Sequence, residues 1–414
     1  MQLLLKNIKQ LVTVAAGGKP WKSGAEMRNV GVVENANVLI EDGIVQWVGG
    51  KGESPTNLLD DATVFDAEGL VALPGFVDSH THMVFAGSRE DEFAMRAEGK
   101  TYQQIAEQGG GILSTVWATR AATKKELKKL ASRRLDAMMQ HGTTTVEIKS
   151  GYGLDEQSEI KMLEAIAELR EEHFMTIVPT FLGAHAVPPE FRERREEYIK
   201  LVCERMLPYI ARRGLAVFCD VFCELGYYTP EESRHILKTA HGLGLKLKLH
   251  ADELAASGGS VLAGELGAVS ADHLEHIDDE GMRQLERGGV VGVLLPGVSF
   301  FLGHGFAPAR KLIDAGVPIA IASDFNPGSC MSFSMPLMLT IACTQMSMTP
   351  EEALTACTLN GAAALGMSDR VGSIEVGKQA DIILYDLPNY RHLPYNFGVN
   401  HVKHIIKNGT ILEF

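Results

Sequence analysis

Histidine and carboxylate residues recur in this sequence at positions where they could share a metal ion. His80 and His82 follow an apolar run that begins at Phe76. Side chains alternate between the two faces of a strand, so imidazoles at i and i+2 point to the same side. Such a pair at the carboxyl end of a strand is suited to bind one divalent cation. Taken alone, the pair fits equally well one buried structural histidine beside one exposed histidine.

The elements that must position these residues can be read from the middle of the chain. Apolar, β-rich runs alternate there with helical patterns, which is typical of parallel βα units. Eight runs span residues 76–85, 143–149, 176–184, 216–224, 245–250, 268–273, 290–295 and 318–323. Eight is the number of strands in a closed barrel. We therefore expect an α/β fold in which residues 67–368 form a (β/α)8 barrel of the TIM type.

The two ends of the chain have a different pattern, made of short strands separated by turns. Residues 36–40 and 44–48 form a hairpin-like pair near the start, and residues 380–385 and 404–411 repeat the pattern near the end. Neither end has enough strands to bury a core alone. We expect residues 1–66 and 369–414 to combine into one small β-sandwich domain.

Further polar residues fall at the ends of the predicted barrel strands. His185 follows the third run, His250 and His273 end the fifth and sixth, and Asp324 follows the eighth. Barrel enzymes build their active sites at this end of the strands. Three imidazoles and one carboxylate, from His80, His82, His250 and Asp324, suit one Zn²⁺ or Fe ion and leave a position open for water. A metal ion would lower the pKa of that water to about 7.

Composition limits the other classes of function. The chain has 414 residues, a formal net charge of −13 and 45% hydrophobic residues, which argues against a nucleic-acid partner and favours a globular enzyme acting on a small molecule. No apolar run approaches the ~20 residues that span a membrane. Lys6 and Lys9 interrupt the stretch where a signal peptide would need its apolar core. The six cysteines are expected to be reduced structural thiols, so we expect a cytoplasmic protein with no membrane partner.

Several segments resemble the amidohydrolase superfamily in its single-metal form. They are the His80 and His82 pair and residues 250–253, 271–273 and 323–324. Members with two metals carry a carboxylated lysine on the fourth strand, whereas run 216–224 has no lysine. Five loop segments are similar to those of the imidazolonepropionases within that superfamily, namely residues 85–90, 108–112, 147–154, 181–185 and 324–329. The resemblance implies a homodimer that hydrolyses the cyclic amide of 4-imidazolone-5-propanoate to N-formimino-L-glutamate, a step in histidine degradation.

The chemistry of that reaction suggests roles for residues at the mouth of the barrel. Glu253 is placed to move a proton from water to the leaving nitrogen. The adjacent Asp252 is the rival, and the resemblance favours Glu253. His273 is a candidate either to stabilise the oxyanion or to orient Asp324, and both readings stay open.

Residues that would hold the substrate rest mainly on the resemblance. Arg89 aligns with a substrate-binding arginine whose planar fork suits a propionate, although a surface salt bridge is its ordinary alternative. The remaining substrate candidates are Tyr102, Tyr152, His185, Glu253, Asn326, Gly328 and Ser329. Two rival functions stay open: a single-metal amidohydrolase acting on a nucleobase or a formimino compound, and a barrel that has lost its metal. A nucleobase has no propionate for Arg89 to bind, so a role of Arg89 in substrate binding would distinguish imidazolone hydrolysis from the first of these rivals.

Overall fold

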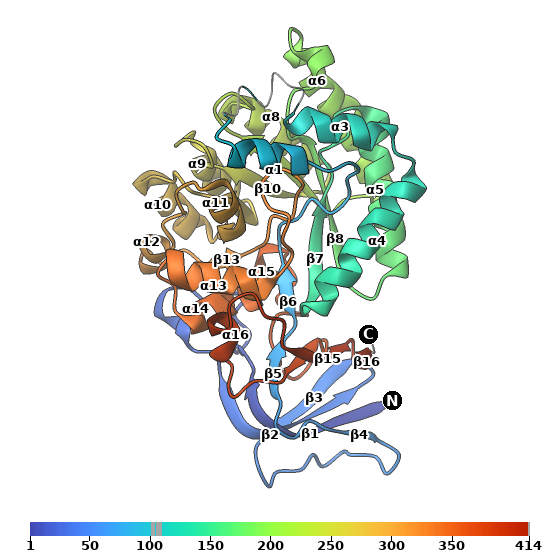
Figure 1. Cartoon of the computed structure of the whole chain (residues 1–414), viewed down its shortest axis with the longest axis vertical. Helices are drawn as coiled ribbons and strands as arrows, with labels where there is room; N and C mark the ends of the chain where they lie inside the picture. Colours follow the sequence, from blue (N-terminus) through green and yellow to red (C-terminus); the bar gives the residue numbers. More distant parts are fainter. Residues whose placement is uncertain (101–103, 105–109, 413–414) are drawn as a thin grey trace.

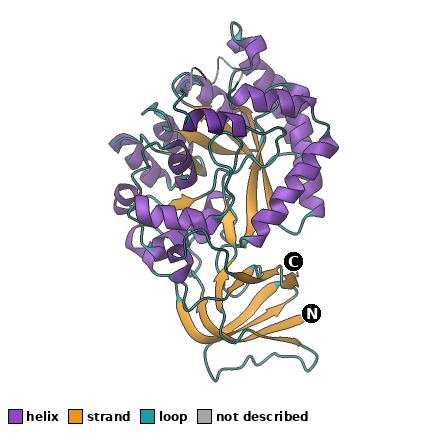
Figure 2. Ribbon diagram, in the orientation of Figure 1, coloured by secondary structure: helices purple, strands orange, loops and turns teal. Residues whose placement is uncertain are grey.

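The chain folds into two eight-stranded sheets, one a parallel barrel and the other a mixed sheet built from both ends of the chain (Figure 1). The structure is a computed structural model and describes residues 1–100, 104 and 110–412. Figure 2 shows helices around the barrel and a terminal sheet, beside the barrel, that carries both chain ends. The predicted α/β fold with a TIM-type barrel is confirmed.

The barrel strands follow one another in chain order, and all their pairings are parallel. They are β6 (Phe76–Asp78), β7 (Thr143–Lys149), β8 (Thr176–Ala184), β9 (Phe218–Cys223), β10 (Lys246–Ala251), β11 (Ser270–His273), β12 (Val291–Leu294) and β13 (Ile319–Ile321). Strands such as β7 and β9 are buried along their whole length. Burial on both faces explains why they read as continuous apolar runs.

The first strand is shorter than its predicted run, because its continuation closes the barrel instead of extending β6. Asp324 N donates to His80 O at 3.0 Å, and His82 N donates to Phe325 O at 2.9 Å. Ser323 N also donates to Asp78 Oδ1 at 3.0 Å. The segments after β6 and β13 therefore lie side by side, and this seam brings the predicted histidine pair to Asp324.

Strands from both ends of the chain make the second sheet. In spatial order they are β16 (Thr410–Leu412), β15 (Val402–Lys407), β14 (Ile382–Tyr385), β5 (Val71–Pro74), β1 (Gln2–Val12), β2 (Val32–Glu41) and β3 (Ile44–Gly49), with β4 (Thr63–Asp66) also paired to β1. Strand β5 pairs with β1 on one side and β14 on the other. Because β5 lies past residue 66, we propose that the domain boundary falls at residues 74–76 rather than at residue 66.

Helices form the outer layer and begin with strong local signals. Thr123 starts α4 and Thr229 starts α8, each with a capping box in which the threonine hydroxyl accepts from the N3 amide. The helices are α1 (Glu90–Ala97), α3 (Ile112–Ala121), α4 (Lys124–Gln140), α5 (Glu156–Glu172), α6 (Arg195–Leu201), α7 (Leu207–Arg213), α8 (Pro230–Gly242), α9 (Gly259–Leu266), α10 (Asp279–Gly288), α11 (Pro296–Leu302), α12 (Ala309–Asp314), α13 (Met335–Gln345), α14 (Pro350–Ala356), α15 (Leu359–Ala364) and α16 (His392–Tyr395). Short turns of other helix types are η1 (Gly24–Arg28), η2 (Pro189–Phe191) and η3 (Val202–Met206).

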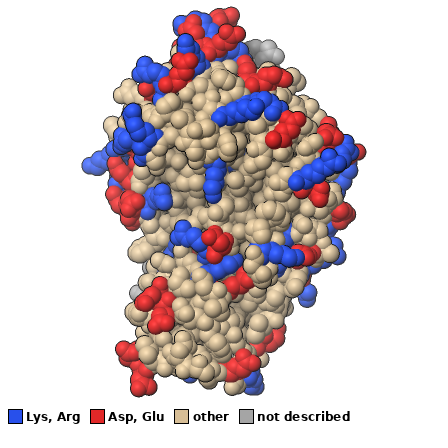
Figure 3. Space-filling model, turned by 180° about the vertical axis from the view of Figure 1, so that it is seen from behind, with Lys and Arg blue, Asp and Glu red and all other residues tan. Residues whose placement is uncertain are grey.

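Charged side chains of both signs are interspersed over the face shown in Figure 3. Among the described residues, no helix combines the length and the apolar character needed to cross a bilayer. All six cysteines are free thiols, and Cys343 alone among them is not fully buried.

Candidate metal centre and active site

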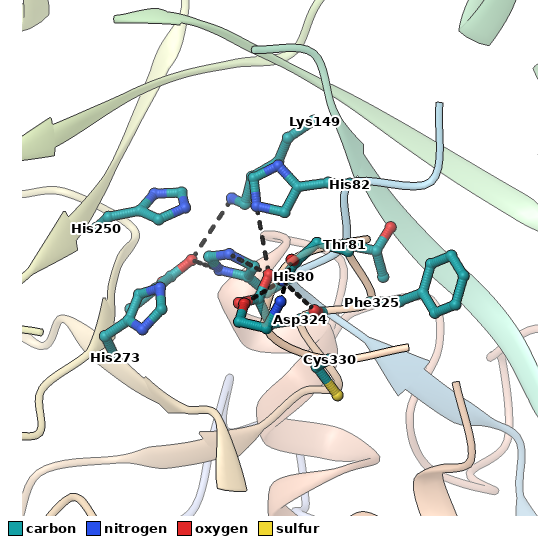
Figure 4. A network of polar contacts seen from close by, with 12 residues as sticks. His80, Thr81, His82, Lys149, His250, His273, Asp324, Phe325 and Cys330 are labelled. Atoms are coloured by element: carbon teal, nitrogen blue, oxygen red, sulfur yellow. Dashed lines mark hydrogen bonds and ion pairs between the residues drawn. The ribbon is translucent and has the colours of Figure 1, made fainter. Parts of the chain in front are cut away.

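The four predicted metal ligands come together at the carboxyl end of the barrel. Asp324 Oδ1 lies 3.5 Å from His80 Nε2 and 3.3 Å from His82 Nε2. The His250 ring centroid is 4.5 Å from that of His80 and 5.6 Å from that of His82. Figure 4 shows these side chains, together with His273, directed toward a common centre. Segments after β6 and β13 and the end of β10 thus supply one cluster.

The free atoms of this cluster fit a metal ion. His80 Nε2, His250 Nε2 and Asp324 Oδ1 are buried, and each has no hydrogen-bond partner among the described residues. Unpartnered buried polar atoms are costly unless a ligand satisfies them. Burial, followed by the charge of Lys149, holds the pKa of His80 well below its usual range, and burial does the same for His82. Neutral imidazoles are the form that binds metal, so the donor set suits a divalent cation.

Two buried aspartates, Asp272 and Asp220, support the histidines from behind. Asp272 belongs to the segment 271–273 that resembles the superfamily, but no role was predicted for either residue from the sequence. Asp272 Oδ2 is 2.6 Å from His80 Nδ1, and Asp220 Oδ2 is 3.0 Å from His250 Nδ1. A carboxylate on one ring nitrogen orients the imidazole and leaves the other nitrogen for the metal. Asp272 immediately precedes His273 at the end of β11, and both side chains lie against His80, because the left-handed backbone at His273 interrupts the alternation of the strand.

Two lysines inside the barrel hold these aspartates. Lys149 Nζ lies 2.8 Å from both Asp220 and Glu147 and 3.5 Å from Asp272, and Lys248 Nζ lies 3.4 Å from Glu147. All of these side chains are fully buried. Burial alone would lower the pKa of Lys149, but the surrounding carboxylates outweigh it and raise that pKa. Lys149 is therefore a cation and joins the carboxylates behind His80 and His250 in one ionic network.

Several residues at the strand ends have left-handed backbone conformations. The φ angles are 47° at Asp324, 80° at His273 and 52° at Asp252. Non-glycine residues adopt such angles at a cost, and they cluster at functional sites. Here the conformation occurs where strands β10, β11 and β13 turn into the loops of the barrel mouth.

Glu253 and Asp252 have different surroundings, which separates the two candidate proton carriers. Asp252 accepts hydrogen bonds from Ser257, Gly258, Gly259 and Ser260 amides at 3.0–3.2 Å, so it braces the loop before α9. Glu253 Oε2 instead lies 3.6 Å from His273 Nε2. Burial, then the charges of Asp324 and Glu224, raises the pKa of Glu253 to about 8. Of the two carboxyls, Glu253 is therefore the one that faces His273, whereas Asp252 faces the loop before α9.

A cavity of about 300 Å³ opens beside Glu253. Its lining includes Glu253, Glu275, Ser299 and His304. Glu275 is a further buried carboxyl, with Oε2 3.8 Å from His273 Nδ1. A cavity of this size lies at the lower end of the range for small-molecule sites.

The Tyr152 and His185 rings both lie against His82. The His185 ring stacks on His82 with centroids 5.1 Å apart, and its Nδ1 lies 3.1 Å from Gly151 O. The Tyr152 ring centroid is 5.6 Å from that of His82. Glu159 on α5 holds the loop that carries Tyr152, because its carboxylate accepts from the amides of Gly151, Gly153 and Leu154. Tyr102 lies outside the described residues.

The loop after Asp324 is braced from within. The Asn326 side-chain amide donates to Asp324 O at 2.8 Å and to Ser329 Oγ at 2.7 Å. Its Oδ1 accepts from Gly328 N and Ser329 N at 2.8 and 2.9 Å. The side-chain NH2 and Oδ1 of Asn326 are thus engaged within the loop, where they hold its shape, rather than directed to a substrate. Arg89 lies against this loop, since a Cβ at Gly328 would be 2.2 Å from Arg89 Nη1.

Comparison with known proteins agrees with this geometry. The amidohydrolase family matches residues 71–412 of the chain. The imidazolonepropionase of Geobacillus kaustophilus is 48% identical over 413 residues, which cover 99% of this chain and 97% of that protein. The imidazolonepropionase of Parabacteroides distasonis is also 48% identical, over 411 residues that cover 99% of this chain and 98% of that protein.

Solved structures with much lower identity share the fold. A triazine hydrolase variant superposes with a TM-score of 0.75 at 18% identity, covering 99% of this chain and 94% of the other. An adenosine deaminase from Xanthomonas campestris with bound zinc has a TM-score of 0.73 at 20% identity, covering 99% of this chain and 92% of the other. These likenesses establish the architecture, and the full-length relatives establish the family. The chain belongs to the imidazolonepropionases of the amidohydrolase family.

Proposed function

We propose that this protein hydrolyses the ring amide of 4-imidazolone-5-propanoate to N-formimino-L-glutamate. The observation that carries the proposal is the convergence of unpartnered, buried donor atoms from His80, His250 and Asp324, with His82 beside them, at the mouth of the barrel. Full-length identity of 48% to imidazolonepropionases supports the choice of substrate.

The ligands of the proposed centre are His80, His82, His250 and Asp324, which would hold one Zn²⁺ or Fe ion per subunit. When bound, such an ion lowers the pKa of a coordinated water toward 7 and polarises a carbonyl oxygen. The donor set contains no thiolate, which supports a catalytic rather than a purely structural site.

The proposed reaction forms one C–O bond and breaks one ring C–N bond. Glu253 takes a proton from the attacking water and returns it to the departing ring nitrogen, so water is consumed and no other reactant is needed. The raised pKa of Glu253, about 8, supports a group that can do both near neutral pH. His273, 3.6 Å from Glu253, would stabilise the charge that develops on the carbonyl oxygen.

The substrate groups away from the metal need their own partners. Arg89 is proposed to bind the propionate, while Tyr152 and His185 are proposed to contact the ring from the side of His82. Gly328 and Ser329 would contribute backbone and hydroxyl contacts, with Asn326 holding their loop in shape. Tyr102 is retained as a substrate-binding proposal from the sequence.

Turnover of freshly prepared imidazolonepropionate tests the function directly. The purified, metal-loaded protein is mixed with this compound and, in parallel, with a panel of nucleobases, cyclic amides and formimino compounds. We expect loss of the ring absorbance and formation of formiminoglutamate only with the first. Preferred turnover of a nucleobase or a formimino compound would overturn the proposal in favour of another amidohydrolase activity.

The assembly and location are proposed on the same family grounds. We infer a homodimer in the cytoplasm, and the six free thiols are compatible with a reducing compartment. Sedimentation of the purified protein checks the dimer.

A further inference from the structure

The guanidinium of Arg89 is held by a neighbouring carboxylate that the proposed reaction does not use. Arg89 directly precedes helix α1, and Glu92 occupies the first turn of that helix. Arg89 Nε donates to Glu92 Oε1 at 3.0 Å, and Arg89 Nη2 donates to Glu92 Oε2 at 2.8 Å. The two side chains are only 11% and 10% exposed. This pair is therefore a shielded two-bond contact rather than a surface salt bridge.

Glu92 does not use all the hydrogen-bond donors of the Arg89 guanidinium. A guanidinium has five N–H groups, and a carboxylate can approach it from the Nε side or from the end formed by both terminal nitrogens. Glu92 takes the Nε side, and it is the sole acceptor of Arg89 hydrogen bonds among the residues that the structure describes. Within the described part of the chain, neither N–H group of Nη1 has an acceptor, and only one of the two on Nη2 has one. The remaining N–H groups form the end-on fork that matches a second carboxylate.

Gly111 holds the Glu92 carboxylate in place, and Gly328 packs against the Arg89 guanidinium. Gly111 N donates to Glu92 Oε1 at 2.9 Å. The absence of a side chain at Gly328 lets Arg89 Nη1 lie against the loop after Asp324. Arg96 Nη1 and Nη2 each donate to Gly328 O at 3.1 Å. With two arginines and one glutamate, this group keeps a net positive charge even though Glu92 neutralises one cation.

We propose that Glu92 is a positioning residue for substrate binding: it fixes the Arg89 guanidinium so that its end-on fork receives the substrate carboxylate. The proposal rests on the proposed function, in which Arg89 binds the propionate. Without Glu92, Arg89 would rotate about its side-chain torsions. Each binding event would then bear the entropic cost of ordering the Arg89 side chain.

A non-hydrolysable ligand isolates this role from catalysis. Imidazole-4-propanoate carries the same tail on a ring with no amide to cleave, and imidazole-4-propanamide lacks only the negative charge. The inhibition constants of both compounds are measured for the metal-loaded wild type, Glu92→Gln and Glu90→Gln. Glu90 lies two residues away on the same helical turn, with an exposed side chain, so its variant is the matched control.

We expect Glu92→Gln to weaken the propanoate about two- to tenfold, the usual cost of ordering one freed long side chain on binding. The propanamide should bind all three proteins alike, and kcat with the natural substrate should stay within about threefold while KM rises. Gly328→Ala is a second variant, because its methyl group would displace Arg89 Nη1; since Gly328 is also a proposed substrate contact, we expect it to weaken both compounds, and the propanoate more than the propanamide.

Equal propanoate binding by Glu92→Gln and the wild type would overturn the positioning role, as would equal losses for the two compounds. Arg89→Ala separates this failure from failure of the proposed function. If Arg89→Ala weakens the propanoate but Glu92→Gln does not, only the role of Glu92 is wrong. If Arg89→Ala has no effect either, the propionate is bound elsewhere and the substrate assignment loses its support.

Discussion

Replacing Asp272 by asparagine should weaken metal binding without changing any proposed ligand. Asp272 Oδ2 lies 2.6 Å from His80 Nδ1, and Oδ1 accepts from Ser270 Oγ at 2.6 Å. An amide nitrogen facing His80 Nδ1 would require that atom to accept, which places the ring proton on Nε2, where the metal must bind. Replacing a carboxylate that orients a ligating histidine typically costs 10–100-fold in affinity.

The surrounding charges work in the same direction. Two lysines and three carboxylates, counting Glu147, Asp220 and Asp272, give the buried network one net negative charge, and the Asp272→Asn change removes it. A less negative environment attracts a cation less strongly. We expect the dissociation constant for Zn²⁺ to rise about 10- to 100-fold, or about 1.4–2.7 kcal/mol.

Competition with a chromophoric chelator measures this constant on apoprotein prepared by dialysis. Asp279→Asn is the control, since Asp279 pairs with Lys311 on the surface of the barrel, with the aspartate side chain 71% exposed. Thermal unfolding of each apoprotein shows whether the fold survives. An unchanged Zn²⁺ affinity in a folded Asp272→Asn protein would refute the role of this aspartate.

Three further outcomes are expected. Glu253→Gln should keep its metal and lower kcat by about 10²–10⁴, so near-normal turnover would remove Glu253 from the mechanism. Glu224→Gln removes a charge that helps to raise the pKa of Glu253, so Glu253 stays ionised to lower pH. The acid limb of the kcat/KM profile should therefore move to lower pH. A shift of that limb to higher pH would contradict the electrostatic account. Glu159→Gln should lower the free energy of unfolding by about 1–3 kcal/mol and raise KM, because the loop carrying Tyr152 loses an acceptor for its amides; unchanged melting and KM would show that this loop is held otherwise.

The barrel and the convergence of the four proposed metal ligands were predictable from the sequence for a physical reason. Parallel strands buried on both faces leave continuous apolar runs, and the active-site end of a barrel is fixed by strand direction. Polar residues at the carboxyl ends of such runs can therefore be predicted to lie close together at one end of the barrel. This reasoning brought His250 and Asp324 together with His80 although they are far apart in the chain.

The supporting residues were not predictable in the same way. Asp272 and Lys149 lie inside buried runs, and their contacts depend on strand register, which hydrophobic patterning does not specify. The role of Glu92 depends on how a loop folds back onto a helix start. Asn326 is similar, because its bonds within the loop appear only in three dimensions. The first barrel strand was predicted too long because pairing across the seam with β13 takes over after Asp78.

Anomalous diffraction at the absorption edge of the bound metal tests the central claim most directly. A crystal of the metal-loaded protein should show one strong peak at the barrel mouth, about 2.0–2.2 Å from a nitrogen of His80, His82 and His250 and an oxygen of Asp324. A peak held by a different set of side chains, or no peak in protein that turns over its substrate, would contradict the account.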